Sequence, residues 1–110
     1  MDKSDLRKFS NAKFVSNNGS VLERMNMLAG KYKRLSDIQK VTEDLDGVSK
    51  EEFIESIDFL AEEKYIHLRT IAEHCPAMLA DCEYKELEGK PTGKGTRLLY
   101  GYIKDDMVEV

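Results

Sequence analysis

The chain has 110 residues, of which 41% are apolar and 35% are charged, and its formal net charge is −4. This composition predicts a single globular domain, and it argues against a protein that binds nucleic acid through an overall positive charge. No apolar run is long enough to cross a bilayer and the N-terminus lacks the apolar core of a signal peptide, so we expect a cytoplasmic protein with no membrane partner.

The first 19 residues form a basic segment, which we expect to be a partly ordered arm or an arm that tracks DNA. Its positive charge comes from Lys3, Arg7, Lys8 and Lys13. The run Ser-Asn-Asn-Gly at positions 16–19 is typical of a linker. The predicted organisation is therefore an arm at 1–19, a domain at 20–104 and a loosely held tail at 105–110.

Two short helices are predicted after the arm, one at 20–29 and one that begins at Ser36. Ser20 with Glu23, and Ser36 with Gln39, have the spacing of a capping box. Gly30 is placed to end the first helix, and the basic connector at 31–34 has room for a very short strand. The expected buried positions are Val21, Leu22, Met25, Leu28, Ala29, Ile38, Val41 and Leu45.

The stretch at 49–65 is the clearest helix in the sequence. Ser49 and Glu52 form a third capping box, and Val48 before the cap can pack on Phe53 as a hydrophobic staple. Apolar residues then recur at spacings of three and four, which places them on one helix face. These residues are Phe53, Ile54, Ile57, Leu60 and Ala61.

The other face of this helix is acidic. The stretch carries six acidic residues and only two lysines, Lys50 and Lys64. Phe59 also falls on this side. A surface that meets DNA phosphates should not carry so many carboxylates, because each one repels phosphate. The acidic residues are Glu51, Glu52, Glu55, Asp58, Glu62 and Glu63.

After residue 65 the pattern changes to that of a β-hairpin. Residues 66–72 are rich in β-forming side chains, residues 73–83 with Pro76 form a loop, and residues 84–90 make a weaker return strand. A turn at 91–95 leads into a last helix at 96–103, with Leu98, Leu99, Tyr102 and Ile103 on its apolar side. The fold class is therefore α+β, with a three-helix core, a two-stranded hairpin and a C-terminal helix.

Two motifs make this arrangement resemble the winged-helix fold. The segment LAEEKYI at 60–66 is similar to the L-x-x-x-G-hydrophobic-I ending of the third helix in repressors of the multiple antibiotic resistance and phenolic-acid types. The segment PTGKGTRLL at 91–99 is similar to their L-T-x-K-G-x-x-L sequence after the wing. Residues 48–66 also resemble small, often prophage-borne, winged-helix proteins of the YjcQ type. The resemblance implies a winged helix-turn-helix fold and a DNA-binding transcriptional regulator.

The sequence departs from these families in three places. Lys64 stands where glycine is usual, so we expect a less sharply turned exit from the helix at 49–65. Pro91 replaces an aliphatic residue. The helix that would read DNA carries Glu51, Glu52 and Glu55 in its first half.

If the protein binds duplex DNA, the third helix would enter the major groove and the wing would contact phosphates. The candidate contacts are Lys31, Lys33, Arg34, Ser49, Lys50, Arg69, Lys85, Lys94 and Arg97, and the alternative is that they are solvated surface residues. We also expect a homodimer, formed through the last helix or the N-terminal arm.

The competing hypothesis is a protein-interaction module that has the fold but does not bind DNA. Phe59, with Glu55 and Glu62 around it, would bind a basic protein partner. Alternatively, Phe59 packs within the chain against the arm, which carries Phe9 and Phe14 among basic residues.

Metal, cofactor and catalytic sites are not expected. His67, His74, Cys75 and Cys82 match no standard zinc spacing, and the two cysteines are expected to be free thiols. The pair His74–Cys75 has no third group to orient it, and the sequence GKGT at 93–96 lacks the strand and spacing of a phosphate-binding loop. We therefore predict that the protein is not an enzyme.

Overall fold

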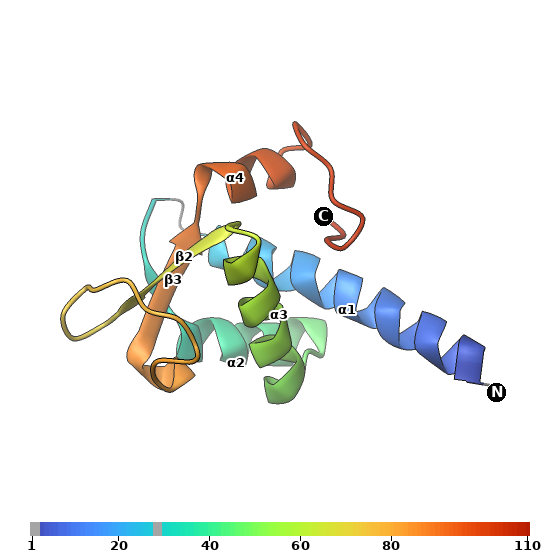
Figure 1. Cartoon of the computed structure of the whole chain (residues 1–110), viewed down its shortest axis with the longest axis horizontal. Helices are drawn as coiled ribbons and strands as arrows, with labels where there is room; N and C mark the ends of the chain where they lie inside the picture. The colour runs from blue at the N-terminus through green and yellow to red at the C-terminus, as the bar shows by residue number, and fades with distance from the viewer. Residues whose placement is uncertain (1–2, 28–29) are drawn as a thin grey trace.

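The computed structural model describes residues 3–27 and 30–110, and it has an α+β fold with four helices and a three-stranded antiparallel sheet (Figure 1). Leu28 and Ala29, which were expected in the core, lie outside the described residues. In chain order the elements are α1 (Lys3–Met25), β1 (Lys33–Arg34), α2 (Leu35–Asp46), α3 (Lys50–Glu62), β2 (Ile66–Thr70), the short 3-10 helix η1 (Tyr84–Glu86), β3 (Leu87–Pro91) and α4 (Gly93–Leu99). None of the helices in the described part of the chain is both long and apolar enough to span a membrane.

The sheet has the strand order β1-β3-β2, so the last strand lies in the middle. The expected hairpin is present, but its return strand begins at Leu87 rather than at residue 84. The reason is local: Glu83 and Glu86 form a reciprocal cap that turns Tyr84–Glu86 into η1. The connector at 31–34 does contain the very short strand for which the sequence left room, and it makes the sheet three-stranded.

Helix α3 confirms the prediction for the central stretch. The Ser49 hydroxyl accepts from the Glu52 amide at 3.2 Å, and the Glu52 carboxylate accepts from the Ser49 amide at 2.9 Å. Phe53, Ile57 and Leu60 are fully buried. They share one core with α1, α2 and the inner face of the sheet. This core fixes the sheet against three helices and leaves its other face to solvent.

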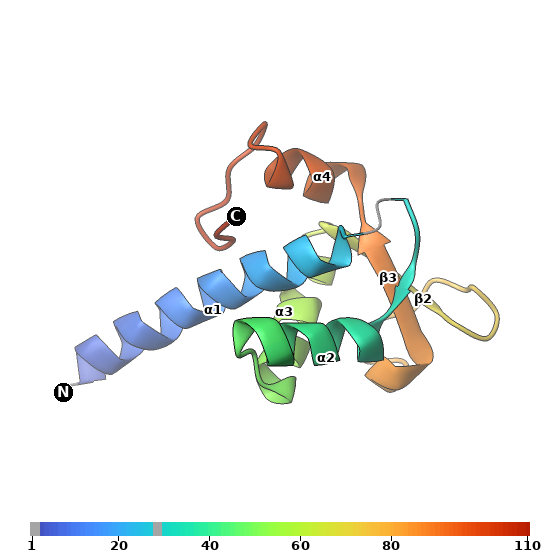
Figure 2. The same cartoon turned by 180° about the vertical axis from the view of Figure 1, so that it is seen from behind.

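The predicted linker at 16–19 is wrong, because α1 is one continuous helix through this run (Figure 2). Asn17, Asn18 and Gly19 are buried, and they contact other parts of the chain. Asn17 donates to the Glu52 carboxylate of α3, and Asn18 donates to the carbonyl of Met107 at 2.9 Å. Ser20 therefore lies inside a helix and does not cap one.

The C-terminal tail is docked on α1, contrary to the expectation that it would be loosely held. Val108 is buried, and the Glu109 amide donates to the Val15 carbonyl at 3.1 Å. Gly19 permits this approach, since a Cβ there would lie 1.6 Å from the Glu109 carbonyl oxygen. The glycine that suggested a linker is thus a packing site for the tail.

The ends of α2 and α4 also differ from the prediction. Helix α2 begins at Leu35 and has no side-chain cap, and Gln39 bonds to Glu43 instead of reaching back to Ser36. Leu45, expected to be buried, lies in the exposed last turn.

Helix α4 begins at Gly93 rather than residue 96, because the Thr92 hydroxyl caps it by accepting from the Gly95 amide. It ends at Leu99 rather than residue 103. Tyr102, expected on its apolar side, is exposed.

Lys64 adopts the left-handed conformation, with φ of 63°, immediately after the C-terminal cap of α3. The turn is therefore as sharp as a glycine would make it, and the expectation of a less sharply turned exit is wrong. The backbone is held there because the Thr92 hydroxyl donates to the Lys64 carbonyl at 2.7 Å.

Replacing Lys64 with glycine should raise the free energy of unfolding by up to about 1 kcal/mol, because glycine adopts this conformation without steric cost. Urea unfolding monitored by circular dichroism would measure the change. The matched control is Lys40→Gly in the interior of α2, which should lower stability by about 1 kcal/mol. A loss of stability in both variants would contradict the strain at Lys64.

Candidate nucleic-acid interface

The outer face of the sheet gathers positive side chains from all three strands. Strand alternation turns Leu68, Leu87 and Gly89 inward, and they are buried. The positions between them face outward. Arg34 and Arg69 both lie opposite Glu88, and His67 lies opposite Lys90. We call the set Tyr32, Arg34, His67, Arg69 and Lys90 the basic sheet face.

Tyr32 holds two of these cations in place. The Arg69 guanidinium carbon lies 3.5 Å from the centre of the Tyr32 ring, and the Lys90 ammonium lies 5.1 Å from it. Such contacts are attractive because the ring face is electron-rich. Arg69 also donates to the Glu88 carboxylate, which fixes the guanidinium further. Two cations are thereby ordered on the solvent side of the sheet, and Glu88 offsets the charge of one of them, Arg69.

A second group of cations follows directly along the chain at α4. The Lys94 ammonium donates to the Glu63 carbonyl at 3.1 Å and lies 4.7 Å from the centre of the Tyr65 ring. Arg97 is exposed on the same helix. Tyr65 anchors the region through a short bond from its hydroxyl to Asp105, and burial together with this carboxylate raises the pKa of the phenol.

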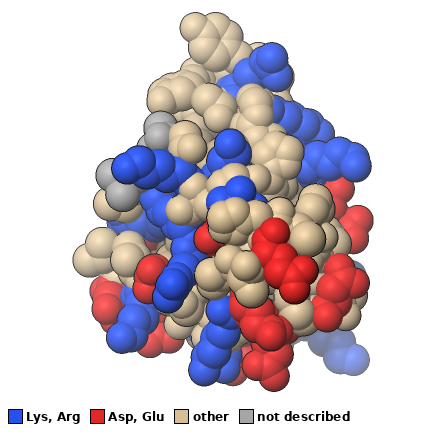
Figure 3. Space-filling view, turned by 90° about the vertical axis from the view of Figure 1, so that its left-hand side faces the viewer, with Lys and Arg blue, Asp and Glu red and all other residues tan. Residues whose placement is uncertain are grey.

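The two groups belong to one side of the molecule. Figure 3, which views the left-hand side of Figure 1, shows Lys and Arg side chains over its upper half with hardly any Asp or Glu among them, whereas acidic side chains are frequent in the lower half. Along β3, Lys90 is the outward-facing position after Glu88 and lies nearer to α4. The basic sheet face and the start of α4 therefore form a surface on which positive charge dominates.

The structure brings only some of the predicted DNA contacts to this surface. Arg34 and Arg69 lie in the basic sheet face, Lys31 is exposed beside it, and Lys94 and Arg97 are on α4. Tyr32 and Lys90 were not predicted. The signals for them were a tyrosine inside the basic run at 31–34 and the outward position of residue 90 in the return strand.

Two predicted contacts have internal roles instead. The Lys33 ammonium donates to the carbonyl of Met25 at 2.7 Å, and burial lowers its pKa. The Ser49 hydroxyl is occupied as the cap of α3. Neither group is presented to a ligand.

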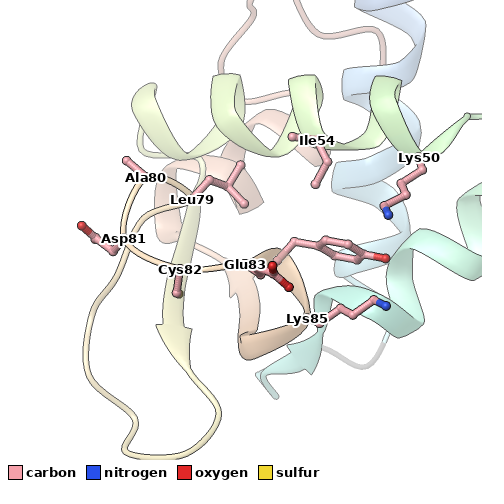
Figure 4. A pocket seen from close by; sticks show the side chains of 9 residues that line it. Lys50, Ile54, Leu79, Ala80, Asp81, Cys82, Glu83 and Lys85 are labelled. Atoms are coloured by element: carbon pink, nitrogen blue, oxygen red, sulfur yellow. The ribbon is translucent and has the colours of Figure 1, made fainter.

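Lys50 and Lys85 lie elsewhere, on two sides of a hollow of about 530 Å³ between the start of α3 and residues 79–85 (Figure 4). The Lys50 ammonium is 5.4 Å from the centre of the Tyr84 ring. Ile54 and Leu79 supply apolar walls. The hollow opens to solvent, and Asp81 and Glu83 line it together with the two lysines. It therefore carries no excess of charge of either sign.

Helix α3 presents carboxylates to solvent. Its exposed side consists of four residues that we call the acidic face: Glu51, Glu55, Asp58 and Glu62. Phe59 is half-buried and meets the Phe14 ring edge-on, with ring centres 5.5 Å apart. The intramolecular packing of Phe59 against the N-terminal segment is thus confirmed, although α1 is a helix there and not an arm.

The histidine and cysteine side chains do not form one cluster. His67 is exposed on the outer side of the sheet, whereas His74 lies 3.9 Å from the Glu88 carboxylate. Both thiols are free, and burial with nearby Glu86 and Asp81 raises the pKa of Cys82. In residues 3–27 and 30–110, no group of three or more His, Cys, Asp or Glu side chains is arranged to hold a metal ion.

Comparisons of the chain with protein-family models, with curated proteins and with solved structures found no match.

Proposed function

We propose that this chain is a winged-helix protein that binds duplex DNA through the basic sheet face, without inserting α3 into the major groove. The fold part of the proposal is supported by the element order helix, strand, two helices and two strands, and by the sheet order β1-β3-β2. A helix-turn-helix pair followed by a hairpin is the arrangement that the sequence motifs at 60–66 and 91–99 resemble. As a DNA-binding protein of this type it would be a transcriptional regulator.

The observation that carries the proposal is the pair of cations ordered around Tyr32. Arg69 and Lys90 are held on its ring, Arg34 lies across Glu88 from Arg69, and Lys94 and Arg97 extend the positive charge to α4. Lysine and arginine that contact phosphates release counterions, and this release supplies most of the affinity for DNA of any sequence. The surface is suited to tracking a phosphate backbone more than to reading base edges.

The acidic face gives the reason for excluding α3 from the groove. Four carboxylates on one exposed helix side would approach two phosphate strands, and each would oppose binding. One carboxylate can accept from a cytosine amine, but four cannot be accommodated in that way. We therefore place DNA at the sheet and not at α3.

Charge reversal on the basic sheet face tests the function. Arg34→Glu and Lys90→Glu should each weaken binding to a labelled duplex about tenfold or more, and should make the salt dependence shallower. Fluorescence anisotropy between about 0.05 and 0.2 M salt measures both effects. Lys40→Glu makes the same charge change at an exposed position of α2, outside the basic sheet face, and should bind like the wild type. Equal affinity in all four proteins would contradict the proposal.

The acidic face supports a second candidate, an interaction module that binds a basic protein partner and no DNA. Phe59 is half-buried against Phe14, whereas Glu55 and Glu62 are exposed and would supply most of the contact. The anisotropy experiment separates the two candidates, because the module would show no salt-dependent duplex binding.

A further inference from the structure

We propose that two copies of this chain pair with each other, and that the N-terminal half of α1 in each copy lies on the acidic face of α3 in the other. We call residues 3–13 of α1 the helical arm. The pairing goes beyond DNA binding and does not depend on it.

The helical arm extends away from the rest of the molecule (Figures 1 and 2). Every residue from Asp5 to Lys13 is exposed, whereas α1 becomes buried from Asn17 onward. At 1.5 Å per residue, the arm is about 16 Å long. The arm continues a helix whose other half is packed, but a separate helix of this length would be marginal in water. A surface that covers one of its sides would stabilise it.

The arm carries an apolar side that is largely exposed in the described part of the chain. Leu6 is 52% exposed and Phe9 is 66% exposed. The two residues are three positions apart, so they lie on one side of the helix. Phe9 and Phe14 also line, with Glu55, a shallow hollow of about 180 Å³ where the arm leaves the domain beside α3. The hollow is lined by two apolar rings and by polar or charged residues, Glu52 and Glu55 among them, so it matches an arm that carries both apolar and basic side chains.

The charges of the two surfaces are complementary. The arm carries Lys3, Arg7, Lys8 and Lys13, with Asp5 as its one acid in the described part of the chain. The acidic face carries four carboxylates. The same kind of pair already occurs within one copy, where the Lys13 ammonium lies 3.0 Å from the Glu52 carboxylate of α3. The occupant that fits the acidic face is therefore the basic arm of a second copy.

Two-fold symmetry allows both contacts to form at once. Each copy contributes one arm and one acidic face, so the interface is made of two equivalent halves. The two α1 helices would run antiparallel, with the Phe9 side chains near the axis. This pairing leaves the basic sheet face of each copy uncovered, because the arm and the sheet lie at opposite ends of the molecule (Figure 1).

A charge-swap experiment on the full-length chain tests the pairing by sedimentation velocity. The wild type should be a dimer that weakens with salt. The arm variant Arg7→Glu/Lys8→Glu and the face variant Glu55→Lys/Asp58→Lys should each be monomeric alone, because like charges then face each other. Their equimolar mixture should form a heterodimer, since both contacts in the mixed pair are again between opposite charges.

Three controls keep the result decisive. Phe9→Asp should also give a monomer, and circular dichroism should show that each variant retains the folded domain. Arg34→Glu should lose DNA affinity and remain dimeric, so that failure of the pairing and failure of the DNA proposal are distinguishable. A monomeric wild type, a mixture without heterodimer, or a dimer that survives Phe9→Asp would each overturn the proposal. The last of these results would indicate a dimer interface at the exposed Tyr100 and Tyr102 beyond α4 instead.

Discussion

Replacing Gly95 with alanine should lower the free energy of unfolding by about 3 kcal/mol, the upper end of the usual cost of overpacking. Gly95 is buried in α4, and a Cβ there would lie 2.1 Å from the backbone carbonyl oxygen of Tyr65. That carbonyl cannot move away freely, because it accepts from the Thr92 amide at 2.9 Å and so holds the start of α4 against the end of α3. Urea unfolding would measure the loss.

Gly93→Ala is the matched control for this prediction. Gly93 lies in the same helix but is exposed, and the nearest atom to a Cβ there is the Arg97 guanidinium at 3.7 Å. Alanine should therefore be neutral or slightly stabilising, in line with its helix propensity. If Gly95→Ala were as stable as Gly93→Ala, the close contact between α4 and Tyr65 would be refuted.

Replacing Glu52 with glutamine should lower the free energy of unfolding at pH 7 by about 2 kcal/mol, because a carboxylate whose pKa falls on folding stabilises the folded state. The carboxylate accepts from the Ser49 backbone amide at 2.9 Å, from the Lys13 ammonium at 3.0 Å and from the Asn17 side-chain amide at 3.3 Å. These contacts, the Ser49 amide first among them, lower the pKa of Glu52 from 4.5 to about 2. Glutamine can still cap α3, so the substitution isolates the contribution of the charge.

The pH dependence follows from the direction of this shift. A carboxyl group whose pKa is lower in the folded state adds stability above its unfolded pKa of 4.5, and that stability is lost as the pH falls toward 2. The difference between wild type and Glu52→Gln should therefore be full at pH 7 and shrink between pH 4.5 and 2. Urea unfolding at several pH values measures it, with Glu51→Gln at an exposed neighbouring position as control. A difference that stays constant over this range would show that the charge is not involved.

Helix α3 could be predicted well because its signals are local. The Ser49–Glu52 cap spans one turn, and the buried residues Phe53, Ile57 and Leu60 follow the helical period. Neighbouring elements were predicted less well where distant contacts decide the structure. Asn18 is bound by a carbonyl 89 positions away, and Gly19 is covered by the tail. No local pattern around residues 16–19 reveals those partners.

In the candidate interface, too, local signals could be predicted and the effects of distant contacts could not. Arg34 and Arg69 could be proposed from their charge alone, but Lys33 next to Arg34 proved to be turned inward to Met25. Which of two adjacent cations faces solvent depends on the pairing of β1, a strand of two residues that is too short to show a period. The roles of Tyr32 and Lys90 depend on the same register, since they meet only when β1 and β2 flank β3.

The proposed pairing and the proposed DNA contact together account for the uneven charge of the chain. The acidic face would be neutralised by the arm of the second copy, and the basic sheet face would be free for phosphates. A dimer of this kind would present two such faces, and both would contribute to the salt dependence of binding.

DNA binding through the basic sheet face is tested most directly by titrating a short duplex into isotopically labelled protein and following the backbone amide resonances by NMR. We expect the largest chemical-shift changes on the basic sheet face, at Tyr32, Arg34, His67, Arg69 and Lys90, with small changes in the first half of α3. Changes concentrated at residues 49–55, or no changes at low salt, would contradict it.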